Sequence, residues 1–166
     1  SKLPMCIPLG NRVKICHDST NRQVKKTALF EFTMKELSGI HAIDYTIIEK
    51  VSNAECLKIK AQHNVYYAEI GLGCYGMSAM EAMAMGMPVL SSMDNFALSV
   101  HPNSPIITVN EQNLRDKILD LVDHRDKIGE IGAKGVEWVR AHHDPMLVGK
   151  QYEWMYDFVK NGRRNV

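Results

Sequence analysis

The chain has 166 residues, of which 45% are hydrophobic and 23% charged, with a formal net charge of +1. This composition is typical of one globular domain, and the near-neutral charge gives no electrostatic case for nucleic acid or an anionic membrane as the main partner. The four cysteines form no Cys-x-x-Cys pair, so neither a zinc site nor a disulfide framework is indicated. No apolar run reaches membrane-spanning length and no signal peptide is evident, and a reducing cytoplasm is the expected location.

The first segment predicts a linker followed by a strand and a helix. Residues 1–11 contain two prolines and a glycine and are expected to be extended. Residues 12–17 alternate polar with apolar side chains, which predicts a strand, and the polar loop that follows leads into a helix through about Leu37. Loops at the carboxyl ends of parallel strands line the ligand crevice, so Arg22, Lys25 and Lys26 are candidates to neutralise a diphosphate. On charge alone, a solvated basic turn is the more frequent explanation.

The next unit is predicted from residues 44–62. Residues 44–51 favour a second strand. Ser52-Asn-Ala-Glu55 has the spacing of a capping box, which predicts a helix running to about Gln62.

The stretch from Asn64 to Ser92 predicts strand, glycine loop, helix and strand. Residues 65–70 suit a half-buried strand, glycines then interrupt the chain, and residues 77–85 predict a short apolar helix that ends at Gly86. The first turn of such a helix favours phosphate. Glu81 is its only ionisable group, and burying it unpaired would cost several kcal/mol. We therefore expect a cation, hydroxyls or cleft water beside Glu81; an ordinary ion pair with a neighbouring Lys or Arg is equally compatible with the spacing.

The last third predicts a loop, a short strand and helices. Residues 93–104 indicate a loop, 105–109 a strand, and 113–122 and 128–139 helices with buried apolar faces. Asp144-Pro145 is typical of a helix start, which is more frequent than a metal site built from His142-His143-Asp144, and the final helix should run through Val159 with four aromatic residues. The alternation of strands and helices predicts an α/β fold with a Rossmann-like, doubly wound parallel sheet.

Two known patterns match the glycine loop. Gly71-x-Gly73-x-x-Gly76 satisfies the dinucleotide fingerprint, with Asp94 near the end of the next strand as the ribose ligand. A longer match is Gly-Cys-Tyr-Gly-Met-Ser-Ala-Met-Glu-Ala-Met-Ala-Met-Gly-Met-Pro-Val-Leu-Ser at 73–91, which resembles the donor-site segment of retaining glycosyltransferases of family 4 (glycosyl transferases group 1). Residues 17–27 resemble a second segment of that family, with Ser19 in place of its proline and Lys26 in place of its glycine.

The resemblance implies the C-terminal, donor-binding half of a GT-B glycosyltransferase. It implies that residues 1–11 link to a missing N-terminal domain, that 12–144 bind the nucleotide sugar, and that the helix 145–160 can cross back to the missing domain. Residues 161–166 are expected to be a tail, and the charges from Lys160 to Arg164 make this end locally basic. It further implies that Lys25 and Arg22 act on the leaving diphosphate and that Glu81 binds the ribose. The other donor-site residues implied are Gly76, Met77, Tyr75 and Val51.

The expected activity is transfer of a sugar, with retention, from a nucleotide-activated donor in carbohydrate biosynthesis. The expected partners are the nucleotide-diphosphate sugar, an unidentified acceptor and the missing domain, with peripheral membrane contact through that domain left open and no metal or cofactor required. One departure from the family is Gly73, which stands where its first acidic residue would be. An NAD(P)-binding oxidoreductase domain and a non-catalytic nucleotide-binding module are the alternatives.

Overall fold

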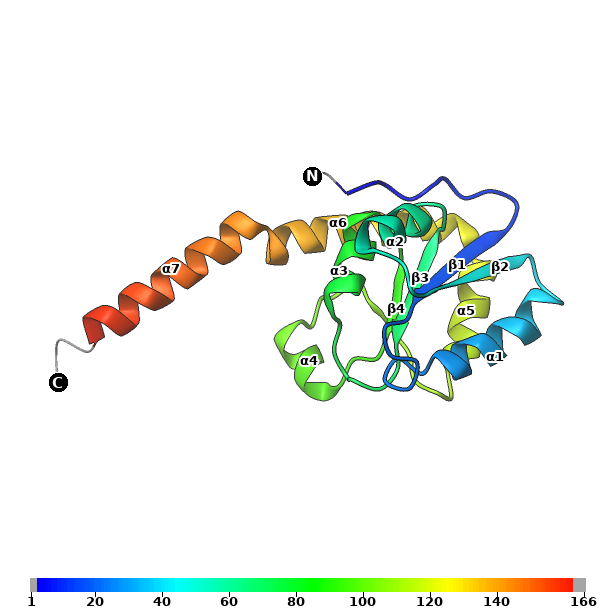
Figure 1. Ribbon diagram of the computed structural model, residues 1–166, viewed down its shortest axis with the longest axis horizontal. Helices are drawn as coiled ribbons and strands as arrows, with labels where there is room; N and C mark the ends of the chain where they lie inside the picture. The colour runs from blue at the N-terminus through cyan, green and yellow to red at the C-terminus, as the bar shows by residue number, and fades with distance from the viewer. Residues whose placement is uncertain (1–2, 163–166) are drawn as a thin grey trace.

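A five-stranded parallel sheet with helices on both faces makes up most of the computed structural model, which describes residues 3–162 (Figure 1). The strands lie in the order β2-β1-β3-β4-β5. Their bounds are β1 Val13–Asp18, β2 Ile43–Ile48, β3 Val65–Glu69, β4 Val89–Ser91 and β5 Ile107–Thr108. The helices are α1 Thr27–Ser38, α2 Asn53–Lys60, α3 Met77–Ala84, α4 Asn95–Val100, α5 Leu114–Asp123, the short 3₁₀ helix η1 Arg125–Lys127, α6 Ile128–His143 and α7 Pro145–Gly162.

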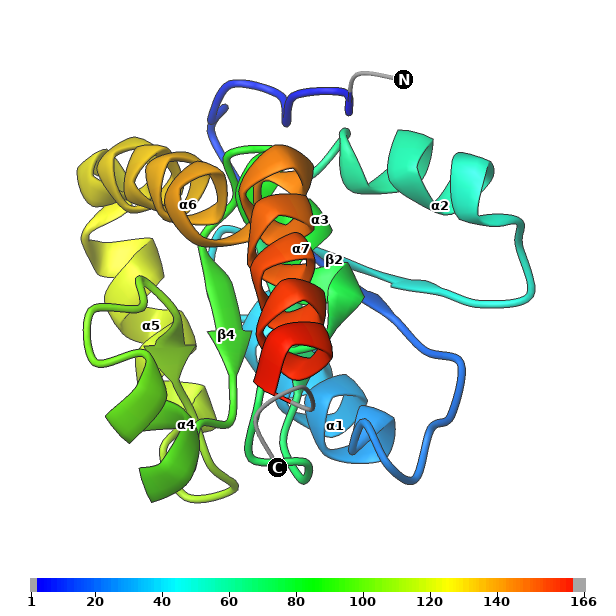
Figure 2. The same cartoon turned by 90° about the vertical axis from the view of Figure 1, so that its left-hand side faces the viewer.

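The two faces of the sheet carry two separate apolar cores because successive strand side chains point to opposite sides. In β3, Val65 and Tyr67 pack with residues of α1 and α5, whereas Tyr66 and Ala68 pack with residues of α2, α3 and α6. Figure 2 shows helices on either side of the strands. The predicted doubly wound α/β fold is therefore confirmed.

Helix ends follow the predicted signals with one exception. The Ser52 hydroxyl accepts a hydrogen bond from the backbone N–H of Glu55 at 3.3 Å, which starts α2 as the capping pattern predicted. The segment 93–104 was expected to be a loop but contains α4. Asp94 caps this short helix by accepting from the N–H of Ala97 at 2.8 Å, so the turn-forming residues that suggested a loop include a helix cap.

Helix α6 sits directly on the turn that ends α3. Gly86, at the end of that turn, has φ +83°, and a Cβ on Gly132 would lie 2.0 Å from its carbonyl oxygen. A Cβ on Gly135 would lie 3.3 Å from the Cβ of Met83. Glycine is thus required at position 132 by close approach, and α6 is fixed against the last turn of α3.

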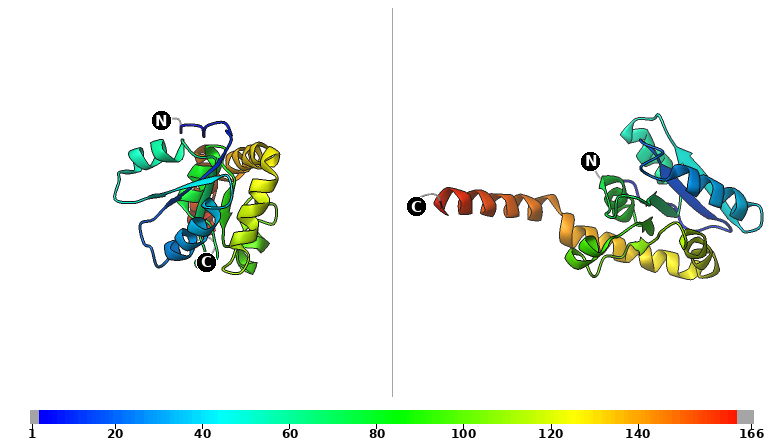
Figure 3. Two further views of the ribbon diagram at one scale, coloured as in Figure 1. Left: turned by 90° about the vertical axis from the view of Figure 1, so that its right-hand side faces the viewer. Right: turned by 90° about the horizontal axis from the view of Figure 1, so that it is seen from below.

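The two ends of the chain differ in how they contact the domain. The extended segment before β1 is tied down by its backbone, since Cys6 N–H donates to Met85 O and Ile7 N–H donates to Ala61 O, both at 2.9 Å. Helix α7 instead projects from the domain (Figures 1 and 3), and most of its large apolar side chains are exposed, Trp154 at 67% among them. Residues 1–2 of the predicted linker and 163–166 of the predicted tail lie outside the described residues. Within residues 3–162, no helix combines the length and apolar character that crossing a membrane requires.

Candidate functional site

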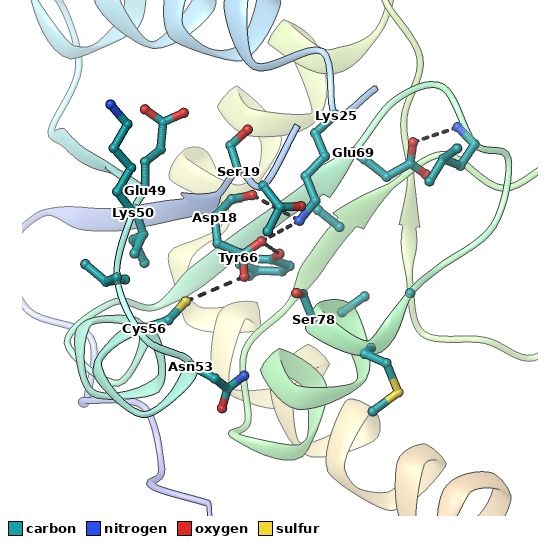
Figure 4. Close-up of a pocket in the computed structure, with 18 residues that line it drawn as sticks. Asp18, Ser19, Lys25, Glu49, Lys50, Asn53, Cys56, Tyr66, Glu69 and Ser78 are labelled. Carbon is teal, nitrogen blue, oxygen red and sulfur yellow. Dashed lines mark hydrogen bonds and ion pairs between the residues drawn. The ribbon is translucent and has the colours of Figure 1, made fainter. Parts of the chain in front are cut away.

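A pocket of about 370 Å³ opens at the carboxyl ends of β1 and β3 (Figure 4); we call it the β1–β3 pocket. In the sheet, β2 and β3 lie on opposite sides of β1, so the strand order reverses direction between β1 and β3. The pocket lies at this switch point, which is the usual ligand position in open α/β sheets. Its lining residues come from the ends of β1, β2 and β3, from the loops that follow these strands, and from the first turns of α2 and α3. The lining residues are Asp18, Ser19, Thr20, Lys25, Ile48, Glu49, Lys50, Val51, Asn53, Cys56, Tyr66, Ala68, Glu69, Leu72, Gly76, Met77, Ser78 and Ala79.

Asp18, the last residue of β1, is the centre of the polar contacts in this pocket. Its Oδ1 accepts from Lys25 Nζ at 2.5 Å and from the Tyr66 hydroxyl at 2.8 Å, and its Oδ2 lies 2.6 Å from Lys60 Nζ. Burial alone would raise the pKa of Asp18, but Lys60 and Lys25 outweigh it and hold that pKa well below its ordinary value. The carboxylate is therefore ionised and bound by Lys25 on one side and Lys60 on the other. Figure 4 shows its contacts with Lys25 and the Tyr66 hydroxyl.

Lys60 lies beneath the pocket, with a side chain that is 0% exposed. Its ammonium group contacts Asp18 and also Glu81, whose Oε2 is 3.3 Å away, and it lies 4.7 Å from the centre of the Tyr66 ring. Burial would lower the pKa of Lys60, but the attraction of Asp18 outweighs it and raises that pKa. Lys60 is therefore the cation beside Glu81, and the contact is an ion pair with a neighbouring lysine, one of the alternatives that the sequence allowed. Its Oε1 accepts from Asn53 at 3.3 Å; Asn53 lines the pocket and Glu81 does not.

The first turn of α3 forms another wall of the pocket. Gly76 precedes the helix, and no side chain in the described part of the chain caps its N-terminus. Gly76, Met77 and Ser78 line the pocket. The free N–H groups of this turn and the positive end of the helix dipole suit an anionic group.

Of the three basic residues named as candidates for a diphosphate, Arg22, Lys25 and Lys26, only Lys25 lines the pocket. Arg22 is held outside it by two carboxylates, with Glu31 Oε2 at 2.7 Å and Glu49 Oε1 at 2.8 Å. Lys26, which replaces the glycine of the family pattern, has φ 51° and ψ 40°. This left-handed conformation is the one glycine adopts most easily, so the substitution keeps the backbone and adds strain.

Of the two remaining expected residues, one lines the pocket and the other is half-buried beside α6. Val51 lines the pocket. Tyr75 does not; its ring packs against Trp138, and its hydroxyl lies 3.1 Å from His143 Nε2. Glu69 also lines the pocket, from the end of β3, and its carboxylate accepts from the N–H of Leu72 at 2.7 Å.

The backbone explains why an acidic residue is absent at position 73. Gly73 has φ +74°, and a Cβ there would lie 2.9 Å from Asp94 Oδ2. Any side chain at this position would be strained and in contact with the Asp94 carboxylate.

The dinucleotide fingerprint receives little support from the same geometry. A Cβ added to its third glycine, Gly76, would meet no atom within 4 Å, so close helix–strand packing does not require glycine there. Asp94, the expected ribose ligand, caps α4 and does not line the β1–β3 pocket.

His17 and His142 both contact hydrogen-bonding groups of the fold. His17 is buried, with Nδ1 3.0 Å from Tyr67 O and Nε2 2.8 Å from the Thr27 hydroxyl, and burial lowers its pKa to about 4. His142 contacts Trp138 O at 2.8 Å, while Asp144 caps α7 as the sequence predicted. Among residues 3–162, no three His, Cys, Asp or Glu side chains are placed to hold a metal ion together.

Sequence reasoning missed the buried pair of Asp18 and Lys60. Asp18 follows a predicted buried strand directly, which is a usable signal for a ligand-site residue. Lys60 gave no such signal, because Lys58-Ile-Lys60 near the end of a helix is also typical of a solvated face.

Comparison with solved structures identifies the fold. The chain is similar to the C-terminal domain of a glycosyl transferase group 1 family protein, LpcC, from Francisella tularensis, with a TM-score of 0.63 at 13% identity over 87% of this chain and 89% of that one. It is similar to sucrose-phosphate synthase from Thermosynechococcus elongatus, with a TM-score of 0.67 at 16% identity over 97% and 51% of the two chains. It is also similar to Anabaena HepE in complex with UDP-glucose, with a TM-score of 0.64 at 12% identity over 89% and 49%.

These matches show the fold: a Rossmann-like α/β domain of the GT-B type, similar in fold to the C-terminal domain of LpcC. The chain spans about half the length of the sucrose-phosphate synthase and HepE chains. No protein-family model and no curated protein matches the sequence.

Proposed function

We propose that this chain is the donor-binding domain of a retaining glycosyltransferase and that the β1–β3 pocket holds a nucleotide-diphosphate sugar. The observation that carries the proposal is the joint presence of Lys25 and the uncapped N-terminus of α3 in one pocket at the switch point of the sheet. The fold, shared with HepE, whose structure contains UDP-glucose, supports it.

The diphosphate would lie between Lys25 and the first turn of α3 at Gly76 and Met77. When the bond between the sugar and the diphosphate breaks, negative charge grows on the leaving phosphate oxygens. An ammonium group and fixed backbone N–H groups stabilise that charge with little reorganisation. Arg22 would take part only after leaving Glu31 and Glu49, so we assign the catalytic role first to Lys25.

The ribose and base would lie toward α2. Glu81 contacts Asn53, which lines the pocket, so the two side chains are suited to bind the ribose hydroxyls together. Val51, 43% exposed at the pocket rim, offers an apolar surface to the base. Tyr75 would support the α3 end of the site through its contact with Trp138 rather than touch the donor.

The rest of the active site would come from a second domain. We propose that residues 3–11 lead to an N-terminal, acceptor-binding domain, that α7 packs against it, and that the enzyme acts in carbohydrate biosynthesis in the cytoplasm. The exposed aromatic face of α7 supports this arrangement, since Trp154 and Phe158 stack on each other at 5.6 Å and both side chains are largely exposed.

The test is a thermal-shift panel of the 166-residue chain with UDP, GDP, ADP, their sugar conjugates, NAD and NADP. A ligand that binds only the folded protein raises the midpoint by mass action. We expect a nucleoside diphosphate to raise it, and we expect Lys25→Ala and Glu81→Gln to abolish the rise. Lys35→Ala is the matched control, because Lys35 is an exposed lysine on α1 that also pairs with a carboxylate.

A rise only with NAD or NADP that is lost in Asp94→Ala would contradict the proposal and favour the oxidoreductase alternative. Binding of a nucleoside diphosphate without sugar transfer by the complete protein would favour the non-catalytic module.

A further inference from the structure

The β1–β3 pocket has an unusual charge balance for an anion site. Its lining includes two lysines and three carboxylates, namely Lys25 and Lys50 with Asp18, Glu49 and Glu69. The lysine nearest the proposed diphosphate is already paired, because Lys25 Nζ donates to both Asp18 Oδ1 and Asp18 O, the latter at 3.1 Å. A bound diphosphate would therefore meet a cation whose charge is already neutralised.

The Asp18–Lys25 pair has one fixed member and one that is less constrained. Asp18 belongs to β1, and without Lys25 it would still be bound by Lys60 at 2.6 Å and the Tyr66 hydroxyl at 2.8 Å, which come from α2 and β3. Lys25 lies in the loop before α1, its side chain is 17% exposed, and its only carboxylate partner within the described residues is Asp18. If the pair opens, the carboxylate stays ionised and in place while the lysine moves.

We propose that Asp18 is a built-in counterion that occupies Lys25 in the unliganded protein, so that a diphosphate must compete with it for the lysine. This inference rests on the proposed function of the pocket and adds that Asp18 sets the affinity of that pocket low. Lys60 is the positioning residue of the arrangement, because it holds Asp18 in place from below while also contacting Glu81.

The direction of the affinity change on removing Asp18 separates a competing role of this carboxylate from a purely structural one. Removing a buried, multiply bonded carboxylate for structural reasons alone would weaken ligand binding. Removing an internal competitor strengthens it, because Lys25 is then free to bind the ligand.

The experiment measures binding of UDP and of inorganic pyrophosphate by calorimetry to the 166-residue chain and its Asp18→Asn variant. We expect affinity for both ligands to rise about tenfold or more in Asp18→Asn. Because this variant leaves Lys60 without its nearest partner, Asp18→Asn/Lys60→Met is measured in parallel; it removes the unpaired buried cation and should also bind more tightly. Circular dichroism checks that each variant is folded.

Two further variants separate the explanations. Asp44→Asn removes an ion-paired carboxylate at the amino end of β2, away from the pocket, and should leave affinity unchanged. In a Lys25→Ala background, Asp18→Asn should give no gain, because the group that both anions compete for is absent.

Equal or weaker binding by folded Asp18→Asn, when the unmodified chain binds UDP, would overturn the inference and leave the proposed function standing. A gain that persists without Lys25 would also overturn it, since Asp18 would then act on the ligand by repulsion alone. If neither the unmodified chain nor any variant binds UDP or pyrophosphate, both the inference and the proposed function fail.

Discussion

Replacing Lys60 with Met should destabilise the protein far more than replacing any exposed lysine. The Lys60 side chain is 0% exposed and its ammonium group lies 2.6 Å from Asp18 and 3.3 Å from Glu81. Methionine fills a similar volume, so the change removes the charge and leaves both carboxylates without the cation between them. The effect therefore measures the buried charge pair rather than a cavity.

The size of the loss follows from the partners that remain. Removing one member of a buried ion pair costs about 3–5 kcal/mol. Asp18 keeps Lys25 and the Tyr66 hydroxyl, and the Glu81 side chain is 21% exposed, so we expect the lower end of that range. A loss of about 3 kcal/mol corresponds to a decrease of about 6–12 °C in Tm for a chain of this size.

Urea unfolding followed by far-ultraviolet circular dichroism measures this loss directly. Lys58→Met is the matched control: Lys58 lies on the same helix and is also ion-paired, at 3.6 Å to Glu55, but its side chain is 73% exposed. Its replacement should cost less than about 0.5 kcal/mol. Equal losses for the two variants would refute the argument, because burial of the charge would then have no energetic consequence.

Three further predictions concern stability. Burial lowers the pKa of His17 to about 4; an unfolded histidine titrates near ~6.5, so protons bind the unfolded state first, and stability should fall by roughly 2 kcal/mol as the pH drops from about 7.5 to about 5. His17→Gln should remove most of this pH dependence in urea unfolding at the two pH values, and an unchanged dependence would contradict the assignment. Lys26→Gly should raise the unfolding free energy by about 1 kcal/mol, because position 26 has φ 51°; a lower denaturation midpoint would count against backbone strain there. Gly73→Ala should cost about 2 kcal/mol, given φ +74° and the 2.9 Å approach to Asp94, whereas Gly129→Ala, with nothing within 4 Å, should cost nothing, and similar midpoints for the two variants would show the glycine loop to be tolerant.

The order of the elements was predictable because local signals agree with the final packing. Apolar runs mark the strands, Ser52 and Asp144 mark helix starts, and Gly86 marks a helix end. The rule that ligands bind at the carboxyl ends of parallel strands then led to the region of the sheet where the pocket lies. Lys25 and Gly76 line the pocket for this reason.

The directions of individual side chains were not predictable in the same way. Arg22 lies three residues before Lys25, yet Glu31 and Glu49 hold it outside the pocket. Tyr75 lies next to Gly76, yet it packs toward α6. Such choices depend on partners distant in sequence, and a single chain without structure does not reveal which charges meet.

The close packing of α6 on α3 also links the projecting helix α7 to the β1–β3 pocket. Helix α3 contributes its first turn to the β1–β3 pocket and its last turn to the contact with Gly132 and Gly135. Gly132 and Gly135 let α6 approach α3 closely, with the Met83 side chain packed directly against Gly135, so a displacement of α6 would also displace α3. Only Asp144 separates α6 from α7. A partner that binds the projecting helix α7 would therefore act, through α6 and α3, on one wall of the β1–β3 pocket.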